Sequence, residues 1–66
     1  MLKIIQSHDD LWDIKRIIGN RNIEIGCIML TNDEVSFTPV SDGYNISIEE
    51  MGQILAKMKE IKGMAH

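Results

Sequence analysis

The 66-residue chain has little of what small domains commonly use to cross-link themselves. It contains one cysteine, Cys27, so no disulfide can form within the chain. Its two histidines, His8 and His66, lie near opposite ends, and no Cys/His pair has the spacing of metal ligands. We therefore expect no metal and no cofactor. Because domains of this size bury only ~60% of their unfolded surface, we expect stabilisation by self-association or a partner.

The chain also lacks long apolar runs and an excess of positive charge. No run approaches the ~20 apolar residues of a membrane span, and the N-terminal MLKII has none of the parts of a signal peptide. The net charge of −3 disfavours nucleic-acid binding, which needs a basic surface. With 44% hydrophobic and 26% charged residues, the composition is that of a globular protein. We therefore expect one small cytoplasmic domain over residues 1–66, without membrane contact.

The N-terminal third predicts a short strand and a helix. Residues 2–6 are rich in β-prone side chains. Ser7 is a good N-cap, with Asp10 three residues on as in a capping box. Leu11, Ile14 and Ile18 then recur at helical spacing, and Gly19 follows as a helix-ending residue. This pattern predicts a helix over residues 8–18.

Residues 22–40 predict a β-hairpin with its turn at Asn32-Asp33, since both residues tolerate positive φ. A two-residue loop pairs Leu30 with Val35, Ile28 with Phe37, and Gly26 with Pro39. Ile28, Leu30, Val35 and Phe37 would then form a core face. Pro39 has no backbone N–H to donate to a neighbouring strand, which predicts that residues 35–40 form an edge strand.

A second helix is predicted to follow the turn-forming segment 41–45. Ser47 and Glu50 form a second capping box, and an apolar stripe follows that comprises Met51, Ile54, Leu55, Met58 and Ile61. The element order is (β)αββα. We therefore expect an α+β fold with a small antiparallel sheet and two flanking helices.

No catalytic constellation is present in the sequence. Paired carboxylates occur at 9–10, 33–34 and 49–50, where helix-start or turn chemistry explains them. Cys27 has apolar neighbours, which is typical of a thiol that packs as a small hydrophobic side chain. We therefore expect no enzymatic activity.

Two features point to a partner-binding surface. Trp12 projects away from the expected helix stripe, beside Arg16, and either covers the rim of the core or serves as an exposed anchor. The other feature is a second apolar face on the first hairpin strand. Either one helix covers each side of the sheet, or both helices cover one side and leave this face bare. We favour the bare face, and the candidate partner-binding residues are Trp12, Arg16, Ile23, Ile25, Cys27 and Met29.

In size and composition the whole chain resembles the compact accessory proteins of bacteriophages, including inhibitors of host or defence enzymes. No motif carries this resemblance, so it assigns no role to any residue. It implies a non-enzymatic module that binds and blocks a host or defence protein, and we expect a homodimer. The alternative is a dimeric nucleic-acid-binding regulator that acts through its lysines and arginines.

Overall fold

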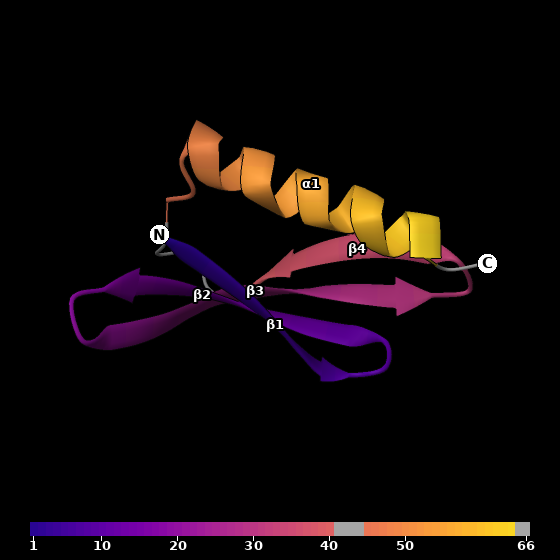
Figure 1. Cartoon of the computed structure of the whole chain (residues 1–66), viewed down its shortest axis with the longest axis horizontal. Coiled ribbons are helices and arrows are strands. Elements are labelled where there is room, and N and C mark those ends of the chain that lie inside the picture. Colours follow the sequence, from indigo (N-terminus) through magenta and orange to yellow (C-terminus); the bar gives the residue numbers. More distant parts are fainter. Residues whose placement is uncertain (41–44, 65–66) are drawn as a thin grey trace.

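The computed structural model describes residues 1–40 and 45–64, and these form one antiparallel sheet and one helix. The strands are β1 (Leu2–His8), β2 (Leu11–Ile18), β3 (Arg21–Thr31) and β4 (Glu34–Pro39), and the helix is α1 (Ile48–Met64). The strands follow one another across the sheet in the order β1-β2-β3-β4. In Figure 1, α1 lies along one side of this sheet, so the α+β fold has two layers.

The prediction of two flanking helices in the order (β)αββα is wrong. Residues 8–18 form the end of β1, a turn at Asp9-Asp10, and β2. Trp12 and Ile14 lie two residues apart and are 5% and 0% exposed, as expected for one face of a strand. The spacing of Leu11, Ile14 and Ile18 suits a helix equally well, so periodicity alone does not decide between the two.

Pairing with β1 explains why this segment is a strand. β1 pairs with β2 from Leu2↔Arg16 to His8↔Leu11, and the Ile17 amide donates to the Met1 carbonyl oxygen at 2.8 Å. A helix at 8–18 would leave the backbone groups of β1 without this partner. Ser7, the expected N-cap, donates its hydroxyl to the Leu11 carbonyl oxygen across the turn instead.

The hairpin of β3 and β4 is confirmed in its turn and in its register. Asn32 and Asp33 have φ values of 50° and 67°, the positive pair that a type I′ turn requires. Leu30 pairs with Val35, Ile28 with Phe37, and Gly26 with Pro39. β4 is an edge strand, as Pro39 predicted.

A β-bulge in β3 changes which residues share a face. Ile14 pairs with Gly26 but Lys15 pairs with Glu24, so Ile25 is an extra residue in β3. The bulge shifts the alternation by one, and Ile23 and Ile25 therefore join Ile28 on the side covered by α1. The prediction that Ile23 and Ile25 share a bare face with Cys27 and Met29 is wrong for this reason.

The second predicted helix is confirmed as α1, including its capping box. The Glu50 amide donates to Ser47 Oγ at 3.1 Å, and the Ser47 amide donates to Glu50 Oε1 at 3.0 Å. The helix continues through Gly63 to Met64. Ser41–Tyr44, most of the expected turn, lies outside the described residues.

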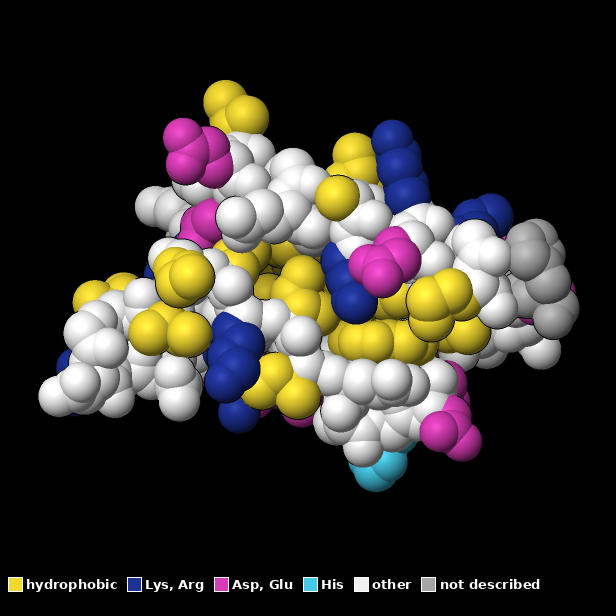
Figure 2. Space-filling model, viewed as in Figure 1, with side chains coloured by type: hydrophobic (Ala, Val, Ile, Leu, Met, Phe, Trp, Pro, Cys, Tyr) yellow, Lys and Arg dark blue, Asp and Glu magenta, His cyan; other side chains and the backbone are white. Residues whose placement is uncertain are grey.

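The core lies between α1 and the sheet, and it draws on three elements. Its fully enclosed members are Trp12, Ile14, Ile25, Ile28, Ile54 and Ile61. Figure 2 shows hydrophobic side chains along the seam between helix and sheet. Only part of the predicted helix stripe is buried: Met51 and Leu55 are 45% and 51% exposed.

Gly26 is the most constrained glycine in the described residues. A Cβ at this position would lie 2.6 Å from Cε1 of Phe37 and 2.8 Å from the Thr38 carbonyl oxygen.

Because Phe37 packs against the backbone here, Gly26→Ala is expected to lower the free energy of unfolding by about 2–3 kcal/mol in urea denaturation. Gly52→Ala is the matched control, since nothing lies within 4 Å of its added Cβ. It should raise stability by about 0.5–1 kcal/mol, and an equal loss in both variants would contradict this account.

Candidate interaction surface

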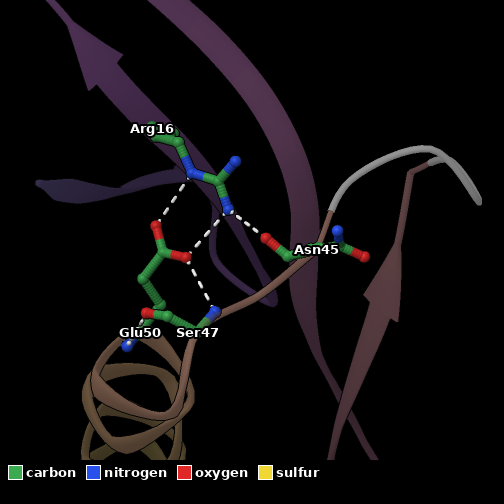
Figure 3. A network of polar contacts seen from close by, with 4 residues as sticks. All are labelled: Arg16, Asn45, Ser47 and Glu50. Atoms are coloured by element: carbon green, nitrogen blue, oxygen red, sulfur yellow. Dashed lines mark hydrogen bonds and ion pairs between the residues drawn. The ribbon is translucent and has the colours of Figure 1, made fainter.

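A bidentate ion pair between Arg16 of β2 and Glu50 of α1 joins the start of the helix to the sheet (Figure 3). Arg16 Nε donates to Glu50 Oε2, and Arg16 Nη2 donates to Glu50 Oε1, both at 2.8 Å. The same Nη2 donates to the Asn45 carbonyl oxygen at 2.7 Å. Glu50 thus holds the arginine and caps its own helix, so one carboxylate positions α1 over the covered side of the sheet.

The environment of Glu50 favours its ionised form. The hydrogen bond from Arg16 is the largest cause, followed by the backbone hydrogen bond from Ser47. Together they lower the pKa of Glu50 from 4.5 to about 2. The two side chains are 19% and 16% exposed, so water reaches the pair only in part.

The opposite side of the sheet has no helix over it in the described part of the chain (Figure 1). We call it the open face. Its apolar members are Ile5 of β1, Leu11 of β2, and Cys27 and Met29 of β3. They lie on neighbouring strands, because Leu11 pairs with Met29, and Asp13 pairs with Ile5 on one side and with Cys27 on the other. Met29 is 41% exposed, and Leu11 and Cys27 are half-buried. This face therefore offers hydrophobic contact area on the three strands β1, β2 and β3.

Charged residues lie within the open face and not only around it. Asp13 and Lys15 are two residues apart on β2 and point to the same side. Lys15 pairs laterally with Lys3 on β1 and with Glu24 on β3. None of these four side chains forms an ion pair or a hydrogen bond within the residues that the structure describes.

A second uncovered apolar surface lies on the helix. Ile48, Met51 and Leu55 recur at intervals of three and four residues, and Ile48 is 92% exposed. One residue of helix turns the side-chain direction by ~100°, so Leu55 points well away from the buried Ile54. We call these three residues the outer stripe. In Figure 2, hydrophobic side chains stand along the helix at the top of the view.

The structure does not bring the six predicted partner-binding residues together. Trp12 and Ile25 are buried in the core, and Ile23 packs against it. Arg16 is engaged with Glu50. Cys27 and Met29 remain on the open face. Partner binding by these residues stays a prediction, and the burial of Trp12 and Ile25 takes them out of reach of a partner.

Sequence reasoning missed Ile5 and Leu11 as members of the open face. The helix interpretation puts Leu11 on the inner side of a helix and treats residues 2–6 as a short lead-in. The alternation of the apolar Trp12 and Ile14 with the charged Asp13 and Lys15 was the available signal. It becomes decisive only when β1 is seen to pair with β2.

Other kinds of site are absent from residues 1–40 and 45–64. No pocket is found there. No group of three or more His, Cys, Asp or Glu residues in this part of the chain could hold a metal ion. The helix α1 is too short and too polar to cross a membrane.

Comparison of the chain with known protein families, with curated proteins and with solved structures finds no match.

The ion pair predicts a pH-dependent contribution to stability. The folded-state pKa of Glu50 is about 2 and its ordinary value is 4.5, so the ionised carboxylate stabilises the fold above about pH 4.5. This contribution is lost as the pH falls from 4.5 toward 2. At neutral pH, Glu50→Gln should lower the free energy of unfolding by about 1–2 kcal/mol, since solvent screens a pair near the surface. Urea denaturation across this pH range measures the difference.

Glu49→Gln is the matched control for this experiment. It removes the same charge from the first turn of α1 at an exposed position that does not contact Arg16. The gap between Glu50→Gln and wild type should close toward pH 2, while Glu49→Gln stays near wild type throughout. A gap that is equally wide at both ends of the range would show that the ion pair is not its source.

Proposed function

We propose that this protein is a non-enzymatic protein–protein interaction module that acts by occupying the surface of a partner. The observation that carries the proposal is the open face, where Ile5, Leu11, Cys27 and Met29 lie on a side of the sheet without a helix in the described part of the chain. Exposed apolar patches of this kind usually mark interfaces. The outer stripe supports the same proposal from the helix side.

The proposed mechanism is steric. A small acidic domain that docks through an apolar surface blocks whatever else that surface of the partner binds. The resemblance in size and composition to bacteriophage accessory proteins points to a host or defence protein as the target. The charged residues within the open face, Lys3, Asp13, Lys15 and Glu24, would then select by charge what binds there.

We place this activity in the cytoplasm. The chain has one cysteine, Cys27, whose half-buried side chain forms no disulfide. A free surface thiol is compatible with a reducing compartment, where thiols are kept unpaired.

The alternative is a dimeric nucleic-acid-binding regulator. Lys3 and Lys15 lie side by side on the open face, which favours contact with phosphate. The acidic Asp13 and Glu24 lie next to Lys15 and weaken its attraction for phosphate, and Arg16 is paired with Glu50. Retention on duplex DNA that falls steeply with salt would favour this alternative over the interaction module.

Affinity capture with surface variants tests the proposed function. The immobilised wild-type chain is compared with Met29→Lys on the open face and Leu55→Lys on the outer stripe, using bacterial lysate and quantitative mass spectrometry. We expect a small set of proteins that wild type retains and that one of the two variants loses at least about tenfold, because a charge in an apolar contact is not compensated.

Gln53→Lys is the matched control for this capture. It adds the same charge at an exposed position of α1 outside both surfaces. It should retain the same proteins as wild type. Identical retention by wild type, Met29→Lys and Leu55→Lys would show that neither surface binds a partner and would refute the proposal.

A further inference from the structure

The two charges that β2 carries on the open face, Asp13 and Lys15, are arranged so that they complement those of a second copy. Asp13 and Lys15 lie on β2, one on each side of Ile14, and both point away from α1. Neither is paired within the described residues. Lys15 lies between Lys3 on β1, which repels it, and Glu24 on β3, so the row of three side chains keeps one net positive charge. A negative charge brought over this row would relieve the repulsion.

Symmetry decides which charges meet when two such faces stack. A two-fold axis along β2 sets Asp13 against Asp13 and Lys15 against Lys15, which is repulsive. A two-fold axis across β2 at Ile14 sets Asp13 of each copy against Lys15 of the other. The second arrangement forms two equivalent ion pairs, and each Asp13 then approaches the row that holds Lys3 and Lys15.

We propose that the open face binds a second copy of this chain, with a two-fold axis that crosses β2 at Ile14 and pairs Asp13 with Lys15 of the other copy. This inference rests on the proposed function and deepens it: the second copy occupies the open face, and the target protein then docks on the outer stripe. The two sheets form the inside of the dimer and the two α1 helices its outside. The outer stripes then stay available to a further protein.

Apolar contacts of the same arrangement support it. Ile17 follows Arg16 on β2 and therefore lies on the open face as well. The axis at Ile14 brings Leu11 of one copy over Ile17 of the other, since both are three residues from Ile14. Leu11 and Ile17 are both half-buried in the isolated chain. The face is four strands wide and about five residues long, so it covers roughly 19 by 17 Å. Two such faces bury about 650 Å² of planar area in total, less than the ~1,200 Å² of standard specific interfaces, which predicts a weak dimer with a dissociation constant of roughly 0.1–1 mM.

Charge reversal tests the pairing directly. Analytical ultracentrifugation over micromolar to millimolar concentrations is expected to show a monomer–dimer equilibrium for wild type. Asp13→Lys places a new lysine against Lys15 of the other copy, and Lys15→Asp places a new aspartate against Asp13. Each variant alone should therefore raise the dissociation constant about tenfold or more. An equimolar mixture of the two variants should form a heterodimer within a few-fold of the wild-type affinity. The double variant Asp13→Lys/Lys15→Asp should recover self-association.

Lys59→Asp is the matched control, because Lys59 is exposed on α1 and lies outside the open face. It should dimerise like wild type. Circular dichroism of each variant checks that the fold is intact, and recovery in the mixture shows that neither substitution acts by unfolding the chain.

Cross-linking through the free thiol of Cys27 provides a second measurement. Cys27 follows Gly26, which lies in the row of the proposed axis, so the Cα atoms of the two Cys27 residues come within roughly 12 Å across stacked sheets. A short bismaleimide should link two wild-type chains, and Asp13→Lys should reduce the yield about tenfold.

Three results would overturn the inference. Wild type that stays monomeric at millimolar concentration rules out the second copy. Single variants that dimerise like wild type, or a mixture that fails to associate, rule out the Asp13–Lys15 pairing. None of these results bears on the capture experiment, in which a different protein can still bind, so failure of the dimer and failure of the proposed function are distinguishable.

Discussion

A single helix must cover a four-stranded sheet, and the rest of the described structure depends on this limit. α1 has 17 residues and is ~26 Å long, enough to cross one face of the sheet and no more. Every enclosed core residue therefore lies on or under that helix. The other face remains bare within the described chain, so the apolar residues it carries are available to a partner.

Two local features shape the covered side of the sheet. The bulge at Ile25 moves Ile23 and Ile25 under the helix, where strict alternation would have left them on the open face. The Arg16–Glu50 ion pair joins the N-terminal end of α1 to β2. What remains on the open face is a mixture of apolar side chains and charges that have no partner among the described residues. That composition suits an interface formed and released in water better than it suits a permanent core.

Local signals predicted the C-terminal half of the fold well. The β3–β4 turn and register follow from Asn32-Asp33, and the start of α1 follows from Ser47 and Glu50, because each depends on residues close in sequence. Residues 8–18 carry apolar spacing compatible with a helix or a strand, and pairing with β1 decides in favour of the strand. The candidate site was predicted only in part, since Cys27 and Met29 lie on the open face while Trp12 and Ile25 are buried.

The sequence by itself determined what is chemically local: a chain with one thiol, a hairpin with its register, and a capped amphipathic helix. Tertiary structure alone decided that β1 converts residues 11–18 into a strand, that a bulge redirects Ile23 and Ile25, and that Arg16 serves the fold. The physical reason is the same in each case. These outcomes depend on backbone hydrogen bonds and contacts between segments distant in sequence, whose free energy no short window of residues contains.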